Sequence, residues 1–173
     1  HPAYGLLAGR ILKSNHEKTA PRTFREAMKR GEALLNSEFL EAVRASGEEM
    51  DGLVSEASID LDYRAFLCLQ RSYLLRKGDE VLETPEMLAA RVSLAIHYPD
   101  MEAVVRAFGS LVSGQYVHAT PTLANAGMVC QQLSSCFLLT VQSDSISGIY
   151  KTLSDTAEIS RAAGGIGLDF SKV

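Results

Sequence analysis

One short stretch of the sequence gathers the side chains that could carry out chemistry. Ser134, Ser135 and Cys136 follow one another and lead directly into the apolar, β-rich run from Phe137 to Val141. Such a run predicts a buried strand. A thiol at the end of a rigid strand can be aimed at a substrate and can later exchange with a partner thiol. From the residues alone, Cys136 remains open between a catalytic thiol and a structural side chain.

Two features further along the chain could bind phosphate. The helix expected over residues 144–162 begins with Asp144 and Ser145, and its first backbone N–H groups have no partner within the helix. Gly164 and Gly165 would let backbone amides approach a ligand closely. An ordinary helix cap and an ordinary turn explain the same residues. These glycines follow a helix and precede a strand, which is the reverse of a dinucleotide fingerprint, so a Rossmann site is rejected.

Composition limits the classes of protein. The 173 residues suffice for one large or two small domains, and 22% charged with 46% hydrophobic residues is typical of a soluble globular chain. The net charge of −4 provides no basic surface for nucleic acid. No apolar run approaches the roughly 20 residues that span a bilayer. We therefore expect neither a nucleic-acid nor a membrane partner, and we expect the chain to be a piece of a longer protein.

The three cysteines, Cys68, Cys130 and Cys136, are too few and too unevenly spaced for a secreted disulfide framework. No Cys or His pattern indicates a zinc site, so we expect no metal and a reducing, cytoplasmic location. Cys68 is interpreted as a small buried hydrophobe, and Cys130 as a loop residue or an off-pathway disulfide partner. His97 is expected at a helix end, and His118 has no assigned role.

The elements that must position these residues change character along the chain. Helical periodicity dominates to about residue 118, and the remainder predicts strand, helix and strand. Parallel strands and a right-handed connection are expected for this last unit. In the first part we expect a helix over Pro2–Ser14, a helix beginning at Pro21 and a helix capped by Ser37. A mobile connection over Arg44–Ser58 should follow, then a helix capped by Asp60 or Asp62 and a hairpin around Lys77–Glu80. The last two helices should begin at Thr84–Pro85 and at Met101, and Gly114 should end the second of them.

The stretch from Thr120 to Val141 is expected to run through three conformations. Thr120-Pro121-Thr122 predicts an extended segment, since the residue before a proline is disfavoured in a helix. Asn125-Ala126-Gly127 predicts a tight turn. The strand is expected over Ser134–Val141, and after the helix a glycine turn leads to a second strand over Leu168–Ser171.

Together these motifs resemble the large, catalytic subunit of ribonucleotide reductase, in its class I form. Four motifs carry the resemblance in order, T-P-T-L-x-N-A-G, Q-L-S-S-C-F-L-L, D-S-I-x-G-I-Y and A-G-G-I-G, beginning at Thr120, Gln132, Asp144 and Ala163. The resemblance implies three regions: residues 1–18 as the end of an ATP-cone region, 19–118 as a mainly α N-terminal helical domain, and 119–173 as the first strand–helix–strand unit of a ten-stranded α/β barrel.

The resemblance also implies a reaction and a set of site residues. The family reduces ribonucleoside diphosphates with a cysteine thiyl radical and a redox cysteine pair, and Cys136 matches the first member of that pair. The positions that match substrate-binding positions are Thr120, Ser135, Cys136, Gly164 and Gly165. Asp144, Ser145 and Ile146 match the site for an ATP or deoxynucleoside triphosphate effector. Arg161 matches a basic residue that reaches this effector.

Partners follow from the same resemblance. It implies a homodimer through the helix over residues 145–162, a separate small subunit that carries the radical cofactor, and thioredoxin or glutaredoxin as reductant. The radical-bearing cysteine and the second redox cysteine belong to segments outside these 173 residues, so the segment alone is expected to be inactive. The alternatives are an adenosylcobalamin-dependent reductase and a non-catalytic, nucleotide-sensing dimerisation module.

Overall fold

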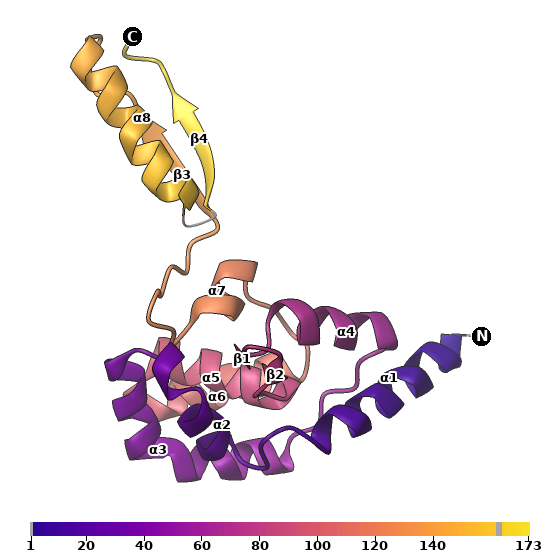
Figure 1. Ribbon diagram of the computed structural model, residues 1–173. Helices are drawn as coiled ribbons and strands as arrows, with labels where there is room; N and C mark the ends of the chain where they lie inside the picture. Colours follow the sequence, from indigo (N-terminus) through magenta and orange to yellow (C-terminus); the bar gives the residue numbers. More distant parts are fainter. Residues whose placement is uncertain (1, 162–163) are drawn as a thin grey trace.

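The computed structural model describes residues 2–161 and 164–173. Figure 1 shows a body of helices and, apart from it, a unit of two strands and one long helix. The body contains α1 (Pro2–Glu17), α2 (Phe24–Arg30), the short 3₁₀ helix η1 (Glu32–Leu34), α3 (Ser37–Glu56), α4 (Tyr63–Ser72), the hairpin of β1 (Arg76–Lys77) and β2 (Glu80–Val81), α5 (Pro85–His97), α6 (Met101–Val112) and α7 (Thr120–Asn125). The separate unit contains β3 (Cys136–Thr140), α8 (Ile146–Arg161) and β4 (Gly165–Asp169).

Side-chain caps fix where most of the helices begin. Asp62, Thr84 and Asp100 each accept a hydrogen bond from a backbone N–H three residues later, which confirms the expected starts of α4, α5 and α6. Two expected starts were wrong. Thr23 rather than Pro21 precedes α2, and Asn36 rather than Ser37 caps α3, because these side chains reach the free amides of Glu26 and Phe39.

The expected mobile connection over Arg44–Ser58 was wrong, because α3 continues to Glu56. Val43, Gly47 and Met50 are buried and recur on one helical face, so packing overrides the polar composition. A Cβ on Gly47 would lie 2.7 Å from the Arg25 side chain, which crosses the helix there. Arg25 then reaches Asp51 at 2.6 Å and ties α2 to α3.

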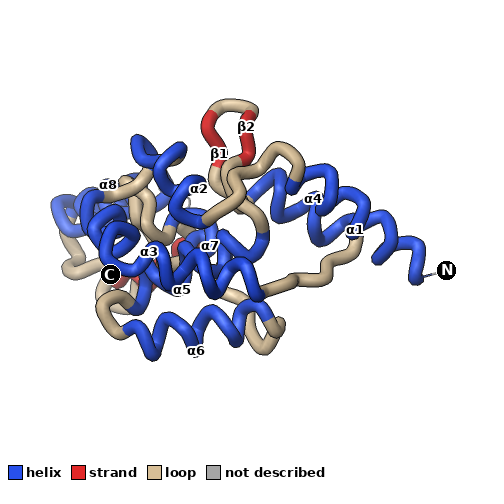
Figure 2. The backbone as a smooth tube through the Cα atoms, turned by 90° about the horizontal axis from the view of Figure 1, so that it is seen from below, coloured by secondary structure: helices blue, strands red, loops and turns tan. Residues whose placement is uncertain are grey.

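The core of the body surrounds α5. Residues 85–94 of this helix are all buried, which no amphipathic surface helix would show. In Figure 2, α6 runs alongside α5, and α3 and α7 also contact it. Phe24, Phe39 and Met50 fill the larger apolar cluster on one side of α5. Leu74, Leu88 and Leu123 belong to a smaller cluster, which brings α4, α5 and α7 together.

The stretch from Thr120 is helical, so the expected extended segment was wrong. Pro121 lies in the first turn of α7, where its missing N–H would have no helical partner. Ala119 takes the extended conformation instead, with ψ of 154°. Gly114 and Gly127 have φ of 70° and 80°, as expected for a helix terminator and a tight turn.

Gly127 is required by both conformation and packing. Its carbonyl accepts from the backbone N–H of Asn36 at 3.0 Å, and a Cβ there would lie 2.9 Å from the Phe39 ring. Replacing Gly127 by Ala is expected to lower the free energy of unfolding by about 1 to 3 kcal/mol, measured by urea unfolding. Gly52→Ala is the matched control, since nothing lies within 4 Å of its Cβ. A Gly127→Ala protein as stable as the control would contradict this account.

The separate unit is a parallel strand pair covered by α8, as expected. Cys136 lies opposite Gly165 in the register and Thr140 opposite Asp169. Three details differ from expectation. β3 spans Cys136–Thr140 rather than Ser134–Val141. β4 begins at Gly165 rather than Leu168, because the Gly165 N–H already donates to the Ser135 carbonyl at 2.9 Å. β3 is not fully buried, since Leu138 is 90% exposed. The residue numbered 162, the expected end of the helix, lies outside the described part of the chain.

Candidate functional site

The end of the strand pair brings four of the predicted site residues together. Cys136 is the first residue of β3, its thiol is exposed, and Ser135 precedes it. A Cβ on Gly165 would lie 3.3 Å from the Ser135 carbonyl oxygen and 3.6 Å from the Cys136 Sγ. A Cβ on Gly164 would meet Phe137 and Ile159 at 2.7 Å. Gly165 therefore lies directly beside the thiol, and Gly164 fits only without a side chain between Phe137 and Ile159.

Thr120 lies on a different element, at the first position of α7, where it is exposed. Its Oγ1 is 3.1 Å from the Tyr73 hydroxyl. No contact joins Thr120 to Cys136 among the described residues. A connecting segment, residues 126–135, leads from α7, which begins at Thr120, to β3, which begins at Cys136 (Figure 1).

Side chains of α7 hold this connecting segment in place. Thr122 Oγ1 donates to the Leu133 carbonyl at 2.9 Å, and Asn125 Nδ2 donates to the Gln132 carbonyl at 2.8 Å. Gln131 Oε1 accepts from the Gly127 N–H at 2.8 Å. The polar residues of the T-P-T-L-x-N-A-G motif therefore attach α7 to the segment that leads into β3.

A buried ion pair, which sequence reasoning missed, lies beneath α7. Arg91 and Glu83 have fully buried side chains and join at 2.7 Å between Nε and Oε1. Arg91 also donates to the carbonyls of Ala126 and Leu123 at 2.7 and 3.1 Å. An arginine within an otherwise apolar helix was the available signal, because arginine is almost never fully buried without a partner.

The predicted effector residues lie at the two ends of α8. Ser145 caps the helix, since its Oγ accepts from the Gly148 N–H at 3.1 Å, and Asp144 and Ile146 beside it are exposed. Arg161 ends the helix with an 84% exposed side chain, 3.7 Å from Glu158. The 16 residues of α8 correspond to about 24 Å at 1.5 Å per residue. A single copy therefore does not bring Arg161 to Asp144.

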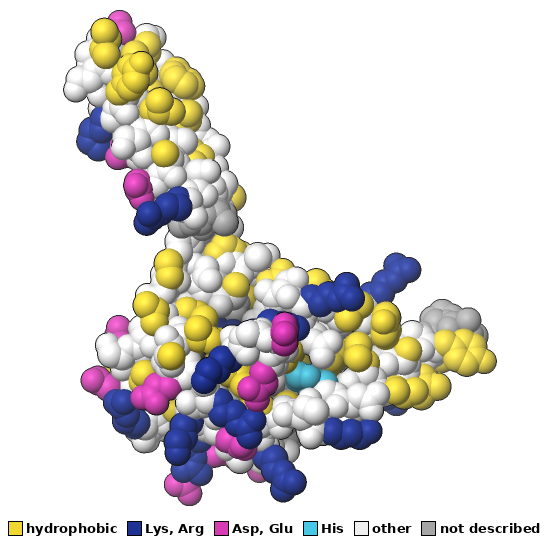
Figure 3. Space-filling view, in the orientation of Figure 1, with side chains coloured by type: hydrophobic (Ala, Val, Ile, Leu, Met, Phe, Trp, Pro, Cys, Tyr) yellow, Lys and Arg dark blue, Asp and Glu magenta, His cyan; other side chains and the backbone are white. Residues whose placement is uncertain are grey.

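The outward face of α8 is apolar. Ile146, Tyr150 and Leu153 follow at helical spacing and are 78%, 66% and 59% exposed, whereas Thr152 on another face is buried. Figure 3 shows hydrophobic side chains gathered on the end of the molecule where this unit lies.

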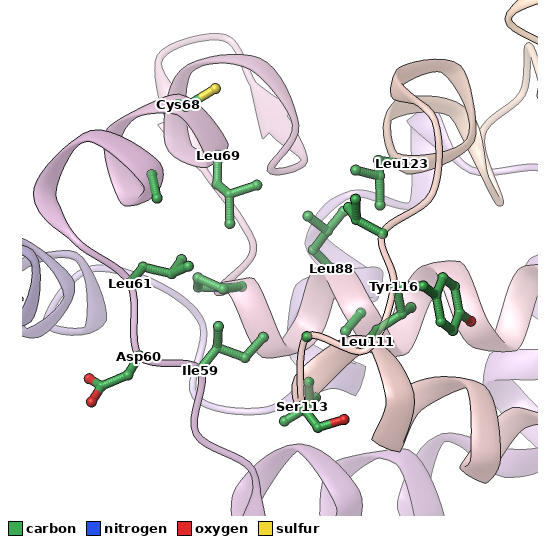
Figure 4. Close-up of a pocket in the computed structure, with 16 residues that line it drawn as sticks. Ile59, Asp60, Leu61, Cys68, Leu69, Leu88, Leu111, Ser113, Tyr116 and Leu123 are labelled. Carbon is green, nitrogen blue, oxygen red and sulfur yellow. The ribbon is translucent and has the colours of Figure 1, made fainter.

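The remaining cysteines and histidines lie apart from this group. Cys68 is exposed, so its expected burial was wrong; it lines an apolar cavity of about 610 Å³ with Leu69 and Leu88 (Figure 4). Cys130 is an exposed, free residue of the connecting segment. His97 ends α5, as expected. Desolvation and the nearby His97 lower the pKa of His118, whose ring packs edge-on against Tyr116.

No group of three or more His, Cys, Asp or Glu side chains that could hold a metal occurs within residues 2–161 and 164–173. In the same residues, no helix has the length and apolar character needed to cross a bilayer.

A second ion pair makes the stability of the body depend on pH. Burial opposes ionisation of Glu86, but the hydrogen bond from Lys13 at 2.6 Å and the Ile59 N–H outweigh it, so the pKa of Glu86 is lowered. A lowered pKa stabilises the fold above the carboxyl's unfolded value, about 4.3, and this contribution disappears as the pH falls through the folded value. Glu86→Gln should therefore cost more stability at pH 7 than at pH 3 in urea unfolding. An equal cost at both pH values would contradict this.

Comparison with known proteins identifies the fold that carries this site. Residues 59–131 match the profile of the ribonucleotide reductase all-alpha domain, and residues 134–173 match that of the ribonucleotide reductase barrel domain. The chain belongs to the ribonucleotide reductase family. The expected architecture is confirmed, because a mainly α N-terminal domain is followed by the start of the barrel domain.

Similar curated proteins are ribonucleoside-diphosphate reductase large subunits. Those of Dictyostelium discoideum and Trypanosoma brucei brucei are 38% and 39% identical over 100% of this chain, and that of Danio rerio is 38% identical over 99%. The chain covers 21% to 23% of the length of these relatives. The division at residues 18 and 118 stays a prediction.

Proposed function

We propose that this chain is part of a class I ribonucleoside-diphosphate reductase large subunit, which makes deoxyribonucleoside diphosphates for DNA synthesis. The observation that carries the proposal is the group formed by Ser135, Cys136 and Gly165, because the Cys136 thiol is exposed and lies directly beside a residue without a side chain. Relatives with this name match the whole chain.

In the proposed reaction Cys136 supplies one of two thiols. A thiyl radical on another cysteine activates the ribose, the 2′-hydroxyl leaves as water, and the two thiols give up two electrons and become a disulfide. Thioredoxin or glutaredoxin then restores the thiols by disulfide exchange. The radical comes from a small subunit that carries the radical cofactor. The isolated 173 residues lack the other cysteines of this scheme and are expected to be inactive.

Substrate contacts are assigned to hydroxyls and backbone amides. Thr120 and Ser135 are exposed hydroxyl residues, which can bond phosphate or ribose oxygens without adding charge. Gly164 and Gly165 would allow the nucleotide to approach the backbone closely.

Effector binding and dimerisation are assigned to α8. We place ATP or a deoxynucleoside triphosphate at Asp144, Ser145 and Ile146, with Arg161 supplied by the other copy of a homodimer. An antiparallel pairing of two α8 helices supports this arrangement, because it would bring opposite helix ends together and would cover Tyr150 and Leu153, which are 66% and 59% exposed.

Leu153→Glu is expected to weaken effector-induced dimerisation of the full-length protein at least about tenfold, since burying an unpaired carboxylate is costly. Lys151→Glu places the same group on another face of α8 and should dimerise normally. Analytical ultracentrifugation with a deoxynucleoside triphosphate measures both. Equal dimerisation of the two variants would refute the assignment of this face.

Reduction of a ribonucleoside diphosphate by the full-length protein, with its small subunit and a dithiol, tests the proposed function. Formation of the deoxyribonucleoside diphosphate supports it. Activity that needs adenosylcobalamin instead of a small subunit would favour the class II alternative. Effector binding without any reduction would favour the nucleotide-sensing module. The cytoplasm is the proposed location, because the thiols must be kept reduced.

A further inference from the structure

We propose that the buried Arg91–Glu83 pair and the Tyr73 hydroxyl are positioning groups for the reductase site, because they fix both ends of α7. The assignment of Thr120 and Ser135 as substrate contacts rests on the proposed function.

Arg91 holds the C-terminal end of α7. Its Nη1 donates to the Ala126 carbonyl at 2.7 Å, and its Nη2 donates to the Leu123 carbonyl at 3.1 Å. Carbonyls at a helix end lack helical partners and attract a cation. With six residues, α7 is far shorter than the roughly 12 residues at which an isolated helix becomes even marginally stable. Its position therefore depends on such anchors.

Glu83 fixes the direction of the Arg91 guanidinium. Its two oxygens accept from Arg91 Nε at 2.7 Å and Nη2 at 3.2 Å, and Oε2 also accepts from the Leu75 N–H at 2.9 Å. This fork locks the plane of the guanidinium and turns its remaining donors toward α7. A lysine ammonium, a point charge without a fork, would not serve both α7 carbonyls in this way.

Tyr73 holds the other end of α7. Its hydroxyl lies 3.1 Å from Thr120 Oγ1, the group proposed to contact the substrate. The Tyr73 carbonyl also accepts from Arg91 Nη2, at 3.5 Å.

The hydrogen bonds of α7 extend this positioning toward the thiol. Thr122 and Asn125 bond the carbonyls of Leu133 and Gln132, directly before Ser134 and Ser135. A shift of α7 would therefore displace Thr120 and the start of β3 together. A misplacement of about 1 Å at a reacting centre can cost on the order of 100-fold in rate.

Arg91→Lys and Tyr73→Phe in the full-length reductase test the proposal. Arg91→Lys should lower kcat/KM for the diphosphate about 100-fold, and Tyr73→Phe should raise KM about fivefold, as expected for one lost hydrogen bond. Hydrogen exchange of residues 119–128 should become faster in Arg91→Lys. Arg106→Lys on α6, whose ion pair with Glu102 is exposed, is the matched control and should resemble the wild type.

A purely structural role would give a different pattern. In that case the variants would contain a smaller fraction of active enzyme, so the apparent kcat would fall. KM and the hydrogen exchange of α7 in the folded protein would stay unchanged. This pattern would overturn the proposal. If the Arg91→Lys protein does not fold, the Tyr73→Phe variant tests the proposal instead. An unchanged KM of Tyr73→Phe would refute the proposal. A wild-type protein without reductase activity refutes the proposed function instead. The exchange of residues 119–128 still reports in that case whether Arg91 holds α7.

Discussion

Cys136→Ser in the full-length enzyme should abolish multiple turnover with a dithiol reductant. Serine has nearly the same shape, but its hydroxyl cannot form the disulfide that the proposed reaction requires. The thiol is exposed at the start of β3, so the substitution disturbs no packing and the loss would be chemical. Product formation over many cycles, measured by chromatography of the nucleotides, gives the result.

Cys130→Ser provides the matched control for this prediction. Cys130 is also an exposed free thiol, on the segment that precedes β3, and its loss should leave turnover within about twofold of the wild type, in keeping with a surface change. Continued turnover by the Cys136→Ser enzyme would remove Cys136 from the redox pair. Loss of turnover in both variants would indicate that the two thiols act together.

Glu83→Leu should lower the free energy of unfolding by about 3 to 5 kcal/mol, because it leaves the Arg91 guanidinium buried without a counter-charge. Both side chains have no exposed surface, so water cannot replace the lost partner. The double variant Glu83→Leu/Arg91→Met should be less destabilised than Glu83→Leu, since the unpaired charge is gone. Urea unfolding of the wild type, both single variants and the double variant measures the coupling.

The exposed Arg106–Glu102 pair sets the scale for comparison. Its side chains are 63% and 84% exposed, and Glu102→Leu should change stability by no more than about 0.5 kcal/mol. Equal effects of Glu83→Leu and Glu102→Leu would show that burial does not decide the strength of these pairs.

Local rules explain which parts of the fold could be predicted from the sequence. Thr84-Pro85 and Asp100 are strong start signals, and α5 and α6 begin where they indicate. The parallel pairing of β3 and β4 followed from the order of elements. Each of these features depends on residues close in sequence or on a single connection.

The features that escaped prediction depend on contacts between distant segments. Arg25 and the α2 surface hold the polar second half of α3 as a helix. Arg91 anchors α7 across 32 and 35 residues of sequence, and nothing local to Thr120 indicates that support. Leu138 reads as core but is 90% exposed on the face of the β3–β4 pair.

The two-stranded sheet has a consequence for how the protein is made. Each strand pairs on one side alone in the described part of the chain, and such open edges are templates for mispairing. The helical body can close with its own residues as they leave the ribosome, whereas β3 and β4 still present their outer edges in the described residues. During synthesis, chaperones should therefore engage this strand pair, while the helical body already resists proteolysis.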